Sequence, residues 1–171
     1  QASLLNRFNE EFVQEKGDVK PLIVVGTRYC NGWGPDMQTY FKPFFSSLDD
    51  DIVVMWTGAN TMSAITKEAY EWPKTQTGVD KDLAAWWNYP VNDAEDSVFF
   101  TNPINFDYSQ DSNPTNIKGV LSNPMNYSEA SKVALFGVAD YTWNPQAFDA
   151  EQNWYDCFDA IIPDDPEMAD A

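Results

Sequence analysis

The stretch LAAWWNYPVND at residues 83–93 decides the architecture of this chain. Its first half is an unbroken apolar and aromatic run, which is typical of a strand covered on both faces. Its second half turns polar, with Asn88 and Asp93 on either side of Pro90. A strand that ends in an amide and a carboxylate beside two indoles predicts a sugar-binding surface. The competing interpretation is a buried strand that runs into an ordinary polar loop.

Three further apolar runs predict strands at 21–25, 52–56 and 119–121. Together with 83–89 they recur about every 30 residues, which is the spacing of repeated βα units with a parallel sheet. Right-handed crossovers would place the carboxyl end of every strand on one edge. Polar or aromatic residues follow these ends, and ligands bind at this edge in α/β folds. They are Tyr29, Thr57, Asn88 with Asp93, and Asn123.

Helical spacing of apolar residues predicts the connecting helices. The expected helices lie at 4–12, at 37–48, from Thr66 towards Trp72, from Ser128 onward and from Asp149 onward. Gly17 supplies a stop for the first helix, and Pro43 should kink or shorten the second. Gln152 is placed for a capping box in the last helix. The acidic triplet 49–51 precedes a strand, so we interpret it as a turn at the end opposite the ligand edge.

The fold class that follows is α/β, with two architectures possible. Four βα units fit a small doubly wound domain or half of a (β/α)8 barrel, because a closed barrel needs eight strands and typically about 250 residues. No strand precedes the first helix, which favours the half-barrel. We therefore expect residues 1–162 to form the carboxyl-terminal half of a catalytic barrel and residues 163–171 to form an acidic tail. No glycine-rich phosphate loop follows the first strand, so a flavodoxin-like nucleotide domain has little support.

Composition narrows the chemistry further. The 171 residues carry a formal charge of −17, with 15% aromatic and 43% apolar residues. Such a globular, acidic chain is a poor partner for nucleic acid or for anionic membranes, and no apolar run is long enough to span a bilayer. The sequence has no histidine, so acid/base catalysis must use Asp, Glu, Tyr or the substrate, and neither a metal nor another cofactor is expected. We expect a secreted, extracellular bacterial protein.

Five segments of the sequence resemble glycoside hydrolase family 84, in the same order as in that family. This family contains the bacterial and animal O-GlcNAcases, some of them described as hyaluronidases. The motifs at 86–91 and 122–125 are the most specific of the five, and the similarity covers most of the chain. The segments are LNRFNEEF at 5–12, WTG at 56–58, WWNYPV at 86–91, SNPM at 122–125 and ADYTWN at 139–144.

The resemblance implies a (β/α)8 barrel that removes N-acetylglucosamine by substrate-assisted catalysis. The 2-acetamido oxygen of the sugar attacks the anomeric carbon, and an adjacent Asp pair orients that group and supplies acid/base catalysis. In the family this pair ends the fourth strand, upstream of the residue that matches Gln1. The resemblance therefore implies that residues 1–171 recognise the sugar but do not hydrolyse it alone.

The resemblance also assigns site residues. Tyr29 matches a tyrosine near the acetamido oxygen or the glycosidic centre, and Asn88 matches an asparagine that supports the acetamido group. Asp93 and Asn123 match the pair that binds the outer hydroxyls of the sugar. Trp86 matches a tryptophan of the acetamido pocket.

Val25, at the end of the first strand, is included among the substrate-binding positions. Trp87 is expected in the core. The loop at 28–33 and the segment after Asp93 depart from the family pattern. These departures affect the expected specificity for the leaving group more than the expected identity of the sugar.

Two hypotheses remain for the protein as a whole. In the first, the chain is part of a β-N-acetylglucosaminidase whose partners are a GlcNAc-containing glycan or an O-GlcNAc protein and a complementing amino-terminal half-barrel. In the second, it is a non-catalytic half-barrel that pairs with itself as a homodimer, hides its exposed edges and binds GlcNAc weakly.

Overall fold

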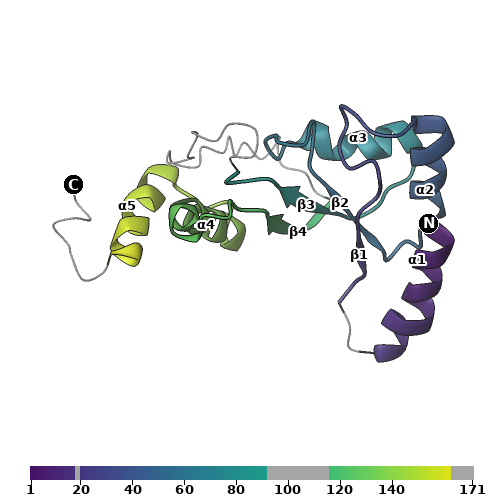
Figure 1. Ribbon diagram of the computed structural model, residues 1–171, viewed down its shortest axis with the longest axis horizontal. Helices are drawn as coiled ribbons and strands as arrows, with labels where there is room; N and C mark the ends of the chain where they lie inside the picture. The colour runs from purple at the N-terminus through teal and green to yellow at the C-terminus, as the bar shows by residue number, and fades with distance from the viewer. Residues whose placement is uncertain (18–19, 92–115, 163–171) are drawn as a thin grey trace. The chain divides into compact units, whose positions relative to one another are not determined.

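The computed structural model describes residues 1–17, 20–91 and 116–162 of the chain (Figure 1). The chain divides into two compact units. Unit 1 contains Gln1–Trp87 with Asp111–Leu121, and unit 2 contains Asn88–Gln110 with Ser122–Ala171. The predicted acidic tail at 163–171 and the predicted site residue Asp93 lie outside the described residues.

Unit 1 is built on a four-stranded sheet in the order β1-β2-β3-β4, with parallel strands. The register pairs Val24 with Val54 and Val54 with Leu83. The predicted α/β fold with four parallel strands is therefore confirmed. The strands are β1 at Ile23–Val24, β2 at Val53–Trp56, β3 at Leu83–Trp87 and β4 at Ile117–Ser122.

Two strand lengths differ from prediction. The first strand is shorter than the expected 21–25, and its apolar run begins with Pro21, which has no N–H to give to a ladder. The fourth strand is longer than the expected 119–121 and includes Ile117. The Leu83 N–H donates to the carbonyl of Asn116 at 2.8 Å, so backbone pairing already starts beside the first residue of β3.

One face of the sheet carries the main hydrophobic core, because the helical segments of unit 1 pack against it. These segments are η3 at Met37–Phe41, α2 at Lys42–Ser47 and α3 at Lys67–Thr77. The expected helix at 37–48 is divided at Lys42, and Pro43 occupies the first turn of α2, where its missing N–H costs nothing. The core side chains are Val24, Phe41, Phe44, Phe45, Leu48, Ile52, Val54, Trp56, Ala69, Tyr70, Leu83 and Ala85.

Alternation along the strands sends the neighbouring side chains to the opposite face of the sheet. On β3, Trp87 and Trp86 therefore lie on opposite faces: Trp87 is 7% exposed, as expected for a core residue, and Trp86 is half-buried. On β1, Ile23 lies on the same face as Trp86 and is 44% exposed. The helix-covered face is therefore the better buried of the two.

The helix α3 runs past the predicted end at Trp72 and includes Pro73 in its interior. Its amino-terminal end is capped as expected, since the Thr66 hydroxyl accepts from the Ala69 N–H at 3.3 Å. The helix ends at Gly78, whose φ of 76° is the left-handed conformation that glycine adopts most easily. The terminating signal was thus the glycine and not the proline.

The first helical segment of unit 1 comprises α1 at Ala2–Phe8, η1 at Asn9–Val13 and η2 at Gln14–Lys16. It ends at Gly17 with φ 72°, as the sequence predicted. The Asn6 amide fastens α1 to the end of α2, because its Nδ2 donates to the Ser47 carbonyl at 2.7 Å and its Oδ1 accepts from the Asp49 N–H at 3.1 Å.

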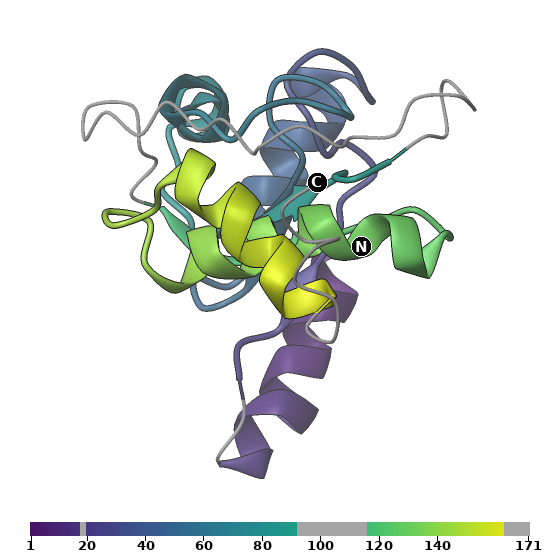
Figure 2. The ribbon, with the colours of Figure 1, turned by 90° about the vertical axis from the view of Figure 1, so that its left-hand side faces the viewer.

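Unit 2 contains two helices that pack against each other, α4 at Ser128–Trp143 and α5 at Ala150–Ile161 (Figure 2). Both begin where the sequence predicted. Asp149 caps α5 by accepting from the Glu151 and Gln152 N–H groups at 3.0 Å each. The reciprocal half of the expected capping box is absent among the described contacts, because the Gln152 amide donates to Asp156 at 2.7 Å instead.

Candidate sugar-recognition site

The loop that follows β1 is attached to the loop that follows β2 by backbone hydrogen bonds. The Thr57 N–H donates to the Tyr29 carbonyl at 2.8 Å, the Asn31 N–H to Gly58 at 3.0 Å, and the Gly32 N–H to Ala59 at 2.8 Å. These bonds continue the pairing of neighbouring strands beyond the sheet. They hold the Tyr29 backbone in a fixed place at the carboxyl edge of β1 and β2.

Arg28 is the centre of this loop, a role that the sequence reasoning missed. Its side chain is buried and donates from Nη2 to the Asn31 carbonyl at 2.6 Å and from Nη1 to the Pro35 carbonyl at 2.9 Å. The guanidinium also lies over the Trp72 ring at 5.2 Å. A buried cation is tolerated when dipoles and a ring face replace water around it. The available signal was an arginine followed closely by two loop glycines.

We expect Gly34→Ala to loosen this loop. Gly34 has φ 134°, and a Cβ there would lie 2.6 Å from the Arg28 Cγ. The backbone would have to shift, so the free energy of unfolding should fall by about 1–3 kcal/mol. Urea unfolding followed by far-UV circular dichroism measures this loss. Gly119→Ala is the matched control, because a Cβ there meets nothing within 4 Å; an equal loss in both variants would contradict the prediction.

Tyr29 and Trp86, two of the predicted site residues, lie together in unit 1. Their ring centroids are 5.3 Å apart, and Trp33 packs edge-on against Tyr29 at 4.8 Å. Trp33 is 47% exposed, and its indole N–H donates to the Thr61 hydroxyl at 3.0 Å. The structure thus adds an exposed tryptophan to the predicted pair. Val25 is 50% exposed at the end of β1.

Thr57 follows β2 as predicted but does not present its hydroxyl to a ligand. The residue is 2% exposed, and its Oγ1 lies 3.1 Å from the Tyr29 carbonyl and 2.8 Å from the Asn60 carbonyl. A small polar residue at a strand end therefore serves here to join two loops.

In unit 2 the structure brings together Asn88 and Asn123, which are 35 residues apart in the chain. The Asn123 Nδ2 donates to the Asn88 Oδ1 at 2.8 Å. The neighbouring residues are also bonded, because the Ser122 hydroxyl donates to the Tyr89 carbonyl at 2.6 Å. Burial raises the pKa of the Tyr89 phenol, so this group stays protonated at neutral pH.

The acidic triplet 49–51 forms a turn, as predicted. The Ile52 N–H donates to the Asp49 carbonyl at 3.1 Å, and Asp51 accepts from the Asn9 amide at 3.0 Å and from the Gln14 amide. This turn precedes β2 and therefore lies at the amino edge of the strands, away from the loops described above.

Other chemistry finds little support in the described part of the chain. No group of three or more His, Cys, Asp or Glu side chains there is arranged to hold a metal ion. Cys30 and Cys157 are free and buried. Burial and, to a lesser extent, the Asp156 charge raise the pKa of the Cys157 thiol, so it stays protonated and unreactive at neutral pH. Within the same residues no helix combines the length and apolarity needed to cross a bilayer.

The parallel βα units, with their loops at the carboxyl edge of the strands, define part of a (β/α)8 barrel. A family model described as beta-N-acetylglucosaminidase (NAGidase) matches residues 1–171, so this chain belongs to the β-N-acetylglucosaminidase family.

Solved structures agree with this assignment. The protein named CpGH84B is 34% identical, with a TM-score of 0.81 over 99% of this chain and 30% of its own. CpGH84D is 32% identical, with a TM-score of 0.79 over 96% of this chain and 27% of its own. A mutant of the Thermobaculum terrenum O-GlcNAc hydrolase is 26% identical, with a TM-score of 0.70 over 94% and 34%. The chain thus spans about a third of the length of these proteins.

Proposed function

We propose that this chain provides the sugar-recognition side of a β-N-acetylglucosaminidase that acts on GlcNAc-containing glycans or O-GlcNAc proteins by substrate-assisted catalysis. The observation that carries the proposal is the 2.8 Å hydrogen bond between Asn123 and Asn88. It joins two residues that the family resemblance assigns to the same sugar. Family membership and the partial barrel support the substrate class.

The bond between the two amides also supports a division of roles. It uses an N–H of Asn123 and the carbonyl oxygen of Asn88. The carbonyl oxygen of Asn123 then remains as an acceptor, which suits the hydroxyl of a sugar. The Asn88 amide, oriented by Asn123, supports the acetamido group. Asp93 is assigned to the outer hydroxyls with Asn123.

Tyr29 and Trp86 are assigned to the acetamido end of the sugar. An indole suits the methyl group of the acetamide, and the phenol provides a hydrogen bond near the acetamido oxygen. The buried Arg28 loop supports this role because it fixes the Tyr29 backbone before a ligand arrives. Val25, which follows β1, is assigned to substrate binding as well.

The reaction itself needs an acid/base pair that none of these residues supplies. We propose that an Asp pair outside residues 1–171 orients the acetamido group and protonates the leaving group, while the substrate provides its own nucleophile. The expected result is that the purified 171-residue chain releases no 4-nitrophenol from 4-nitrophenyl β-N-acetylglucosaminide. Turnover that survives purification, without any complementing fragment, would contradict this part of the proposal.

Sugar binding tests the recognition role separately from turnover. We expect N-acetylglucosamine to shift the side-chain amide resonances of Asn88 and Asn123 in NMR spectra of the chain. Asn123→Ala should weaken this binding about tenfold or more, because it removes an acceptor for the sugar and leaves Asn88 without its orienting donor. Asn126→Ala, at an exposed position in the same unit, is the control and should bind as the wild type does. No saturable shift, or equal losses in the two variants, would contradict the assignment.

A self-associating half-barrel is the second candidate. It is favoured by the exposure of Ile23 on β1 and of Val25 directly after it, at 44% and 50%, because exposed apolar side chains at an edge strand favour pairing with another chain. Static light scattering should then give the mass of a dimer, and a monomer with a cooperative melt would argue against this candidate. In either case the excess of acidic residues supports a secreted, extracellular protein.

A further inference from the structure

Trp33 is an exposed tryptophan in the loop that follows β1, at the carboxyl edge of the sheet of unit 1. Its side chain is 47% exposed, although large aromatic rings are mostly buried on average. Its indole N–H donates to the Thr61 hydroxyl at 3.0 Å, so the polar atom of the ring is already bonded. The surface that Trp33 offers to another molecule is therefore mainly the carbon surface of the indole.

The backbone is fixed on both sides of Trp33. The buried Arg28 guanidinium donates to the Asn31 carbonyl at 2.6 Å before it and to the Pro35 carbonyl at 2.9 Å after it. A Cβ at Gly32 would lie 2.4 Å from a side-chain oxygen of the loop that follows β2, so the two loops approach each other as closely as a glycine allows. A ring that is held in this way loses little conformational freedom when a ligand packs on it.

Trp33 also adjoins the residues proposed for the sugar. Tyr29 is the ring that both indoles contact, because its centroid lies 4.8 Å from that of Trp33, with the planes at 81°, and 5.3 Å from that of Trp86. The resemblance places Tyr29 near the acetamido oxygen or the glycosidic centre. These two positions adjoin in a substrate-assisted reaction, because this oxygen attacks the anomeric carbon. The leaving group is attached at the same carbon, so an indole that contacts Tyr29 lies within its reach.

We propose that Trp33 binds the leaving-group sugar of a GlcNAc-terminated glycan by stacking on its pyranose ring. This inference rests on the proposed function and narrows its substrate class from glycans and O-GlcNAc proteins to glycans. The faces of a pyranose ring carry C–H groups, whose slight positive charge suits the negative face of an indole. Contact between the two also removes apolar surface from water, which favours binding further.

A polypeptide leaving group fits these loops less well. Extended peptides are commonly bound through main-chain hydrogen bonds to the protein. In the two loops the N–H groups of Asn31, Gly32 and Thr57 already donate to carbonyls of the neighbouring loop, at 2.8–3.0 Å. The exposed ring of Trp33 is therefore better suited to a sugar face than to a peptide backbone.

The test compares three ligands in NMR titrations of the full 171-residue chain. They are methyl β-N-acetylglucosaminide, a disaccharide with the same GlcNAc β-linked to methyl galactoside, and Nα-acetyl-serine methylamide that carries the same GlcNAc on its hydroxyl. Affinities are measured at the side-chain amide of Asn123. We expect the disaccharide to bind about fivefold more tightly than the other two ligands and to be the one that shifts the indole N–H resonance of Trp33.

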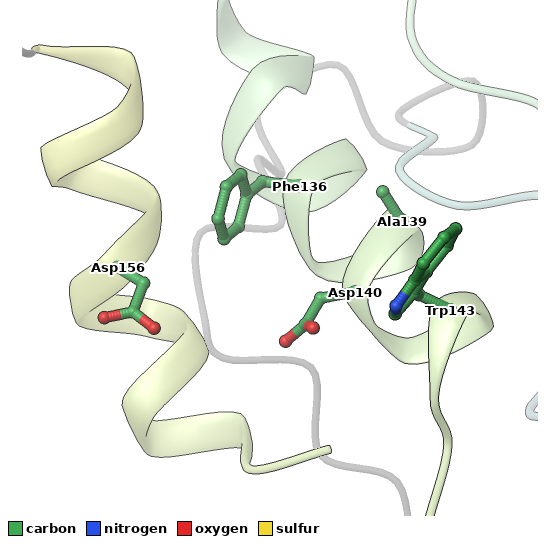
Figure 3. A pocket seen from close by; sticks show the side chains of 5 residues that line it. All are labelled: Phe136, Ala139, Asp140, Trp143 and Asp156. Carbon is green, nitrogen blue, oxygen red and sulfur yellow. The ribbon is translucent and has the colours of Figure 1, made fainter. Parts of the chain in front are cut away.

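Variants show whether the gain comes from Trp33. Trp33→Ala should make the affinities for the disaccharide and the monosaccharide equal, and Trp33→Phe, which keeps a ring, should retain a ratio of about two. Trp143→Ala is the matched control, because this indole is 89% exposed and lies beside a cavity of about 360 Å³ lined by α4 and α5 of unit 2 (Figure 3). It should leave the ratio at the wild-type value.

The outcomes separate this inference from the proposed function. Equal affinities of the wild type for the disaccharide and the monosaccharide, or a ratio that both Trp33 variants leave unchanged, would overturn the role of Trp33 while GlcNAc binding still supported the proposed function. A serine ligand that binds as tightly as the disaccharide would also overturn it, because the surface would then not select a sugar. No shift with any of the three ligands would contradict the proposed function and this inference with it.

Discussion

Trp56→Ala is expected to lower the free energy of unfolding by about 3–5 kcal/mol, the largest loss among the substitutions considered. Trp56 is fully buried in the core of unit 1. Its ring lies 5.4 Å from Phe41 and 6.0 Å from Trp72 between centroids. Truncation to alanine would leave a cavity among these rings, because the helices above β2 cannot close it fully. Urea unfolding followed by far-UV circular dichroism measures the loss.

Substitutions at Trp56 should also affect the loop that follows β1, because the Trp56 indole N–H donates to Asn31 Oδ1 at 2.9 Å. Trp56→Phe keeps an aromatic ring but removes this donor, so it should cost about 1–3 kcal/mol and increase amide hydrogen exchange at Asn31 and Gly32. Trp143→Ala is the control for loss of an indole at an exposed position and should change stability by less than about 0.5 kcal/mol. Unchanged exchange at Asn31 in Trp56→Phe would show that the loop does not depend on this bond.

Lys81→Met is expected to cost about 2–4 kcal/mol, because buried acceptors would lose their donor. The Lys81 side chain is 1% exposed, although it carries a charge. Its Nζ donates to the Leu48 carbonyl at 2.8 Å and to the Asp49 carbonyl at 3.0 Å, and lies 3.3 Å from the exposed Asp50 carboxylate. Leu48 is the C-cap of α2, so the ammonium also stabilises the negative end of that helix.

The position of Lys81 explains why the loss should be large. Lys81 precedes β3 in sequence. Its hydrogen bonds join the end of α2 and the turn before β2 to the amino edge of the sheet. Lys74→Met is the matched control, because Lys74 pairs with Asp80 while both side chains are more than half exposed. Exposed pairs contribute little, so the urea midpoint of this control should stay at the wild-type value. A wild-type midpoint in Lys81→Met would contradict the role assigned to the buried ammonium.

The sequence by itself determined the order and type of the main elements. Apolar runs at the βα spacing identified all four strands, and Gly17, Thr66 and Asp149 marked helix ends correctly, because caps and stops act through local backbone geometry. It also identified the family. The prediction was weaker where local rules compete, as at Pro73, which does not end α3 because tertiary packing of the helix against the core outweighs a single proline.

The tertiary structure alone decided which polar residues serve the site and which serve the fold. Thr57 and Asn88 both follow strands, and periodicity cannot show that one hydroxyl joins two loops while the other residue's amide pairs with Asn123. Likewise, no sequence pattern marks Arg28 and Lys81 as buried, but Arg28 binds backbone carbonyls of its own loop and Lys81 binds those at the end of α2 and in the turn before β2. Such contacts join residues that are distant in sequence or that meet only in a folded loop, and no local pattern encodes them. The sequence at 83–93 was enough to predict strand β3, but only the folded chain places Asn88 beside Asn123.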